Sequence, residues 1–174
     1  MKCIRTSVFE TNSSSTHSIC ISKENIINFP TAIHFGFGEY GWENDTVYET
    51  ADYLYTGIVQ NNMTECIDKI KEILDRHNIA YTFAKIKKND WYANGCIDHA
   101  GELYDFINDI CSDEDKLLRY LFGDNVIYTG NDNSNEDTDM CYCAEETIYN
   151  YETNEYYSNP NHNTEKYEYY FKGN

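Results

Sequence analysis

The chain has 174 residues and carries 30 acidic side chains against 13 Lys and Arg, a net charge of −17. Such a surface repels nucleic acid and anionic membranes, because proteins bind both by neutralising phosphate groups with cations. We find no run of 18 apolar residues and no apolar leader segment, which predicts a soluble, cytoplasmic protein. The seven cysteines lack the spacing of a disulfide framework and are typical of reduced thiols.

The shortage of cations is not a by-product of base composition. Abundant Asn, Ile and Tyr indicate an AT-rich genome, which would normally enrich Lys as well. The charge is also uneven, because residues 36–60, 91–125 and 126–174 carry −5, −6 and −8 while the rest is close to neutral. Two interpretations stay open: the charge serves solubility alone, or it attracts a basic protein partner.

The first half of the chain changes from strand to helix periodicity. Alternation of apolar and polar residues predicts strands at 2–10 and His17–Ser22, with a polar loop between them, and a third strand at Ala32–Phe37. From Asp45 the apolar spacing becomes helical and runs to Ile58, with Asp45 or Thr46 placed to cap the helix.

The second half contains three more predicted helices and further strands. The expected elements, in chain order, are a helix at 64–77 capped by Thr64, a strand at Ile79–Ile86, a helix from Asp98 or His99 to Ile110, a short helix from Ser112 to Gly123, a strand at Asn125–Thr129, a polar loop at Gly130–Asp139, and a hairpin that pairs Ala144–Tyr151 with Lys166–Phe171.

This order of elements predicts an α+β fold with a mainly antiparallel sheet, about four helices and a C-terminal β-hairpin. No internal repeat or domain boundary is visible in the sequence. We therefore expect a single domain over residues 1–174, in which 140–174 forms an acidic, Tyr-rich hairpin extension.

Eight polar residues, TNSSSTHS at 11–18, lie between the first two predicted strands. Backbone amides in such a turn can hold an anion, and His17 could act as a base toward Ser13, Ser14 or Ser15. The absence of glycine excludes a Walker-type phosphate loop. The alternative is a polar turn in which the side chains satisfy the backbone locally.

Two further motifs lie at element junctions. Asp98 and His99 start a predicted helix, where an acidic residue is favoured by the helix dipole, but neighbours on a helix do not face each other, so Asp98 is expected as an N-cap. Asn131 and Asp132 follow a strand, where sites often lie. The spacing from Asp132 does not match a calcium loop, and no Cys or His spacing fits zinc, so we expect no metal and no cofactor.

The C-terminal region alternates carboxylates with tyrosines. Carboxylates spaced along a β-ribbon can imitate a row of phosphates, and tyrosines add rigid contact area with a polar tip. The residues that we expect to contact a partner are Glu145, Glu146, Glu152, Glu155, Tyr156, Tyr157, Glu165, Tyr167, Glu168 and Tyr169. An ordinary amphipathic hairpin is the alternative.

The three motifs FETNSSSTHSICI, IDH and IYTGNDN resemble a family of uncharacterised proteins from Firmicutes, their phages and mobile elements. The resemblance covers roughly residues 1–135, and NSSSTHS is its most specific part. It implies a bacterial host cytoplasm and a mobile-element setting, in which small accessory proteins commonly antagonise host defence. It implies no reaction mechanism, and the acidic tail lies beyond it.

Two functions from different classes follow from these features. The first is an acidic, non-enzymatic inhibitor that binds a basic surface of a host nucleic-acid-handling protein, such as a CRISPR-type defence effector, without contacting nucleic acid itself. The second is a small enzyme in which the serines, His17, Asp98, His99, Asn131 and Asp132 act on a nucleotide, an ADP-ribosyl group or a phosphoester. A structural role in a phage particle is a third reading.

Overall fold

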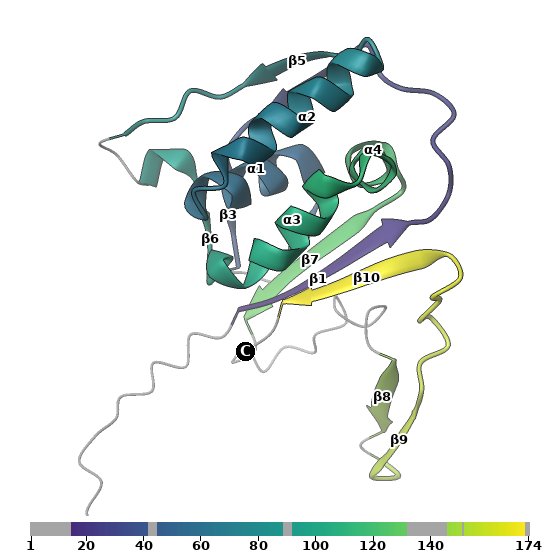
Figure 1. The fold of residues 1–174 in the computed structure, drawn as a ribbon. Helices are drawn as coiled ribbons and strands as arrows, with labels where there is room; N and C mark the ends of the chain where they lie inside the picture. The colour runs from purple at the N-terminus through teal and green to yellow at the C-terminus, as the bar shows by residue number, and fades with distance from the viewer. Residues whose placement is uncertain (1–14, 42–44, 89–91, 132–145, 151, 173–174) are drawn as a thin grey trace, which may run out of the picture.

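A computed structural model describes residues 15–41, 45–88, 92–131, 146–150 and 152–172 of the chain. Its fold is α+β, with helices packed on one side of a mainly antiparallel sheet (Figure 1). The strand predicted at 2–10 lies outside the described residues, as do residues 11–14 and 132–139 of the polar loops predicted at 11–18 and 130–139.

In the described part of the chain, the central sheet has four antiparallel strands in the order β10-β1-β7-β4. Their bounds are β1 Ser15–Ser22, β4 Asp45–Val47, β7 Val126–Asn131 and β10 Tyr167–Lys172. In β1, His17, Ile19 and Ile21 share one face, and all three are buried. Ile127 and Val47 lie on the same face of their strands and extend this buried row across the sheet.

Within the described residues, four α-helices form the other layer: α1 Thr50–Gln60, α2 Thr64–Arg76, α3 Tyr104–Ser112 and α4 Glu114–Phe122. Figure 1 shows α1, α3 and α4 over the sheet, with α2 outside them. Their apolar stripes meet in one core, which includes Leu54, Ile70, Ile107 and Leu117. A buried hydrogen bond of 2.8 Å from the Tyr120 hydroxyl to the Thr50 carbonyl fastens α4 to α1.

Short strand pairs and 3-10 helices complete the body of the fold. Two parallel pairs join β2 to β5 and β3 to β6, and two short 3-10 helices precede β6 and α3. Their bounds are β2 Ala32–Phe35, β3 Glu39–Tyr40, β5 Ala80–Phe83, β6 Cys96–Ile97, η1 Tyr92–Asn94 and η2 Ala100–Leu103.

The C-terminal hairpin has a different partner from the one predicted. Strand β8, Thr147–Asn150, pairs with β9, Glu155–Ser158, whereas β10 pairs with β1 in the central sheet. The Asn150 side chain closes the turn by accepting hydrogen bonds from the backbone N–H groups of Glu152 and Thr153, at 2.8 and 3.2 Å. Asn154 then adopts a left-handed conformation, φ 56°, which Asn tolerates well.

Two predicted helix starts and one predicted helix cap were wrong. The first helix begins at Thr50, because Thr46 and Val47 pair with β7 as strand β4 instead. Thr64 begins α2 but does not cap it, and the short helix is capped by the Asp113 carboxylate, which accepts from the Lys116 N–H at 3.0 Å. The predicted stop at Gly123 is confirmed.

Candidate functional site

Three of the predicted site residues converge around Gly41. This glycine has a φ of +109°, and a Cβ added to it would lie 2.9 Å from His17 Nε2, 3.0 Å from Asp98 Cβ and 3.2 Å from Ser15 Cβ. The segment after β3 therefore passes directly over the start of β1 and the end of β6. Only glycine fits, because a side chain would be both strained and crowded.

His17 is held inside the protein by Tyr53. Its side chain is 0% exposed, and its Nδ1 atom makes a hydrogen bond of 2.6 Å with the Tyr53 hydroxyl. Burial raises the pKa of Tyr53 well above its usual range, so this hydroxyl keeps its proton. Ser15 is also buried, and its hydroxyl donates to the Asp98 backbone carbonyl at 3.3 Å.

A hollow of about 390 Å³ opens beside this cluster. It is lined by Glu39, Tyr40, Gly41, Asp45, Thr46, Val47, Glu49 and Thr129. Thr129 is the β7 partner of His17, yet neither His17 nor Ser15 lines the hollow. A general base must come within hydrogen-bond reach of its substrate. In this structure Gly41 lies between the hollow and His17 Nε2, and the His17 and Ser15 side chains are buried and hydrogen bonded to other residues of the protein.

The acidic residues that line this hollow lie outside the motifs from which a site was predicted. Glu39, Asp45 and Glu49 are exposed around Tyr40. Burial, followed by the Asp52 and Glu49 carboxylates, raises the pKa of Tyr40 well above its usual range, so Tyr40 stays neutral here. No periodic pattern connects residues 39–49 with Thr129, so only the fold reveals the hollow.

Asp98 and His99 do not lie at an ordinary helix start. His99 has a left-handed backbone, φ 53°, and neither residue caps the following 3-10 helix through its side chain, so the predicted N-cap is wrong. The left-handed turn instead brings His99 Nε2 to 3.8 Å from Asp98 Oδ1. His99 is exposed at the surface while His17 is buried.

In the third motif, residues 129–131 continue a strand: they belong to β7, where Asn131 is paired with Ser15. Asp132, Ser13 and Ser14 lie outside the described residues, and Glu145 does too. Across the part of the chain that the structure describes, no three His, Cys, Asp or Glu side chains are grouped to hold a metal ion.

The predicted partner-binding residues fall into two groups. Glu146, Glu152, Glu155, Tyr156 and Tyr157 are exposed on or beside the β8–β9 hairpin, which Figure 1 shows projecting from the body of the protein. The two tyrosines are 73% and 47% exposed. Aromatic side chains this accessible, next to carboxylates, form a surface suited to a protein partner.

The second group lies on β10 or just before it. Most of its side chains are less exposed than those of the first group and contact other residues of the protein. Tyr167 and Tyr169 are half-buried, whereas Glu165, which precedes the strand, is exposed. The ring of Tyr169 stacks on His162, with 4.5 Å between ring centroids. Glu168 is turned toward the helices, as described next, and does not face outward like the hairpin carboxylates.

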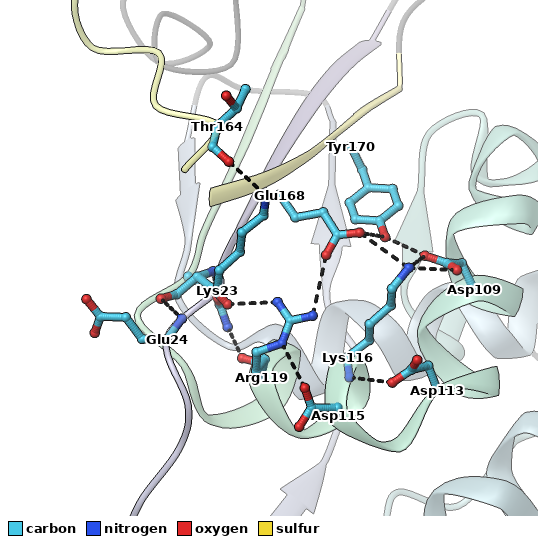
Figure 2. Close-up of polar contacts among 12 residues, drawn as sticks. Lys23, Glu24, Asp109, Asp113, Asp115, Lys116, Arg119, Thr164, Glu168 and Tyr170 are labelled. Carbon is cyan, nitrogen blue, oxygen red and sulfur yellow. Dashed lines mark hydrogen bonds and ion pairs between the residues drawn. The ribbon is translucent and has the colours of Figure 1, made fainter. Parts of the chain in front are cut away.

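Figure 2 shows the ion cluster that holds Glu168. Its carboxylate lies 3.3 Å from Lys116 Nζ and 3.5 Å from Arg119 Nη2, and it accepts a hydrogen bond of 2.9 Å from the Tyr170 hydroxyl. Lys116 also binds Asp109, at 2.7 Å, and the single hydroxyl proton of Tyr170 is shared between the Glu168 and Asp109 carboxylates. These contacts tie β10 to α3 and α4, so Glu168 has a structural role.

The contacts in this cluster shift the pKa values of Asp109 and Lys116. Hydrogen bonds from Lys116 and then Tyr170 lower the pKa of Asp109 below its usual range. The same contact raises the pKa of Lys116. Both groups therefore keep their charges over a wider pH range than they would in an unfolded chain.

Cations are absent from a long stretch of sequence around the hairpin. No Lys or Arg occurs between Arg119 and Lys166, whereas this stretch contains ten acidic residues. Within the described part of it, Glu146, Glu152 and Glu155 make no ion pair. Among the described residues, no cation is thus paired with the carboxylates of the hairpin.

No protein-family model, curated protein or solved structure matches this chain. The resemblance carried by the three motifs stays a prediction. Within the residues that are described, none of the helices combines the length and apolar character needed to cross a membrane.

Proposed function

We propose that this protein is an acidic, non-enzymatic inhibitor that binds a basic surface of a host nucleic-acid-handling protein. The observation that carries the proposal is the β8–β9 hairpin, where exposed Tyr156 and Tyr157 stand beside carboxylates in a region without cations. A basic groove that normally holds phosphates offers both the charge and the flat surfaces that such a hairpin requires.

The two side-chain types have separate roles in this proposal. Tyrosines bury a large area at low cost in side-chain entropy and are frequent hot spots of interfaces. The carboxylates of Glu152 and Glu155 guide the approach to a positive surface, which speeds association at low salt. The defence effector of a CRISPR-type system is one class of host protein with such a surface.

The alternative of a small enzyme has less support. Ser15, His17 and Asp98 do converge, but Ser15 and His17 are buried, and the serine hydroxyl is hydrogen bonded to a backbone carbonyl. Catalysis by this cluster would require a route for substrate through Gly41, where the backbone is closely packed. The exposed hairpin needs no such rearrangement.

Affinity capture from a lysate of the natural host, at low and high salt, tests the proposal. We expect a basic, nucleic-acid-handling protein to be retained at low salt and released at high salt. With that partner purified, Tyr156→Ala/Tyr157→Ala should weaken binding by about 30-fold or more, the effect of losing one hot-spot side chain. Its control is Tyr104→Ala, a 51% exposed tyrosine at the start of α3.

The charge contribution is measured with a matched pair of triple variants. Glu152→Gln/Glu155→Gln/Glu165→Gln removes three exposed carboxylates from the C-terminal region, and Glu65→Gln/Glu72→Gln/Glu102→Gln removes three exposed carboxylates from the helical layer. Only the first should slow association and flatten the salt dependence. Equal affinities of wild type and the first variant at low salt would contradict the proposal. Glu168 is left intact because it stabilises β10.

A further inference from the structure

The hollow beside β3 and β4 has a lining that is complementary to a positive charge. Glu39, Asp45 and Glu49 line it, and no Lys, Arg or His of the described residues does. The three carboxylates are exposed, and within the described part of the chain none of them forms an ion pair. With about 390 Å³, the hollow falls within the size range of ligand-binding clefts, about 300–1,000 Å³.

Paired strands hold the walls of this hollow in place. Glu39 and Tyr40 form β3, which pairs with β6, whereas Thr46 and Val47 belong to β4, which pairs with β7. The Tyr40 ring also packs on the buried ring of Tyr53, with 5.1 Å between the ring centroids. Because the walls are formed in advance, a group that enters the hollow pays little to order them.

Two tyrosine rings adjoin the carboxylates. After burial, the Asp52 and Glu49 carboxylates raise the pKa of Tyr40, so negative potential reaches this wall. Tyr48 is 79% exposed, and its neighbours Val47 and Glu49 both line the hollow, so its ring stands at the edge. A guanidinium group fits such a lining, because its plane stacks on aromatic rings while its N–H groups pair with carboxylate oxygens.

The chain segment that forms the hollow resembles the hairpin segment in charge. Neither 24–68 nor 120–165 contains a Lys or Arg. The two most exposed tyrosines of the described residues, Tyr48 and Tyr156, lie one in each segment. Figure 1 shows β3 among the helices and the β8–β9 hairpin projecting away from them. The chain thus presents two separate acidic surfaces, each with an exposed tyrosine.

We infer that the hollow is a second contact surface for the basic host partner, from which it receives an arginine side chain. This inference rests on the proposed function and adds a site to it. A second copy of the chain is disfavoured as the occupant, because two net charges of −17 repel each other. Lysine is disfavoured relative to arginine, because an ammonium group cannot pair with a carboxylate through two parallel hydrogen bonds.

A second contact on the same chain also raises the overall affinity. Once the hairpin has bound, the hollow meets the partner at a high effective concentration, and the reverse order of binding gives the same gain. Loss of either surface should therefore weaken the complex, and loss of both should weaken it further.

An NMR titration of the full chain with an arginine–glycine repeat peptide tests the hollow without the host partner. The same peptide with lysine, or with the uncharged isostere citrulline, in place of arginine provides the comparison. We expect the arginine peptide to shift the amide signals of Tyr40, Gly41 and Glu49. The lysine peptide should bind there more weakly, and the citrulline peptide should not bind.

Matched variants identify the side chains responsible. Glu39→Gln/Asp45→Asn/Glu49→Gln should raise the dissociation constant read from these signals at least about fivefold, the combined effect of three exposed ion pairs. Its control, Glu65→Gln/Glu72→Gln/Glu102→Gln, removes three exposed carboxylates that do not line the hollow and should change the constant less than about twofold. Tyr48→Ala should raise the constant about two- to fivefold, whereas Tyr104→Ala should leave it unchanged.

The purified host partner separates this inference from the proposed function. If the hollow variant loses affinity and Glu152→Gln/Glu155→Gln/Glu165→Gln does not, the role of the hairpin is refuted and the hollow is supported. The opposite pattern refutes the hollow.

Two results of the peptide titration would also overturn the inference. One is a set of signals that shift evenly over all acidic surfaces. The other is a lysine or citrulline peptide that binds the hollow as tightly as the arginine peptide. Unchanged far-UV circular dichroism spectra check that the variants are folded.

Discussion

Substitution of Glu168 by Gln tests whether this carboxylate, unlike its exposed neighbours in the C-terminal region, stabilises the fold. Glu168 is one of ten residues predicted to contact a partner, yet its carboxylate faces Lys116 and Arg119 inside the protein. The change keeps the shape of the side chain and removes its charge. It therefore weakens the link between β10 and the helical layer without opening a cavity.

The cost can be estimated from the geometry. Two unit charges 3.3 Å apart interact by about 5 kcal/mol at an effective dielectric constant of about 20. Much of this is offset, because the Glu168 side chain is 27% exposed and Lys116 keeps its second contact with Asp109. We expect a loss of about 1–2 kcal/mol in the free energy of unfolding, above the usual value for a surface ion pair.

Urea unfolding followed by circular dichroism measures this loss, with Glu165→Gln as the control. Glu165 lies three residues away, is exposed and has no ion pair among the described residues. Its substitution should change stability by less than about 0.5 kcal/mol. Should Glu168→Gln unfold at the same urea concentration as wild type, the ion cluster does not fasten β10, and the assignment of a structural role to Glu168 is wrong.

Two further predictions concern the core and the response to acid. Gly41→Ala should lower the free energy of unfolding by roughly 2–4 kcal/mol in urea, because of the positive φ and the 2.9 Å approach to His17, whereas Gly101→Ala, with open space around its Cβ, should be nearly neutral. Stability should fall in acid, because contacts with Lys116 and His77 lower the folded-state pKa values of Asp109 and Glu114 respectively. The stability that these contacts contribute is present in full above the pKa of an unfolded carboxyl group, about 4. It is lost as the pH falls through the lower pKa values of the two carboxyl groups in the folded protein. Asp109→Asn should make the acid branch of stability against pH less steep, and an unchanged branch would rule out this explanation.

Local sequence patterns predicted much of the helical layer. The apolar stripe of α2 and the stop at Gly123 were both found, because each depends on residues within a few turns of the same helix. The start of α1 was misplaced because Val47 fits a helical spacing and a strand equally well. Its pairing with Ile127, 80 positions further along the chain, is what decides between them.

The candidate sites, too, could be predicted only in part from the sequence. Ser15, His17 and Asp98 belong to the predicted site motifs and do meet in the fold. The motifs contain no information on the burial of these residues or on Gly41, around which they gather. Glu168 and Glu165 look equivalent in the alternating C-terminal sequence. Only the tertiary structure distinguishes them. Helix α4 lies beside β10, so Glu168 forms an ion pair with Lys116, whereas Glu165 is exposed to solvent.

By itself, the sequence determined the charge of −17, the absence of cations between Arg119 and Lys166, and the alternation that makes the C-terminal residues strands. Tertiary structure alone decided that β10 joins β1 and that β8 and β9 form the projecting hairpin. The physical reason is that periodicity reports which face of an element is buried. The partner of a strand depends on contacts between residues that are distant in the chain.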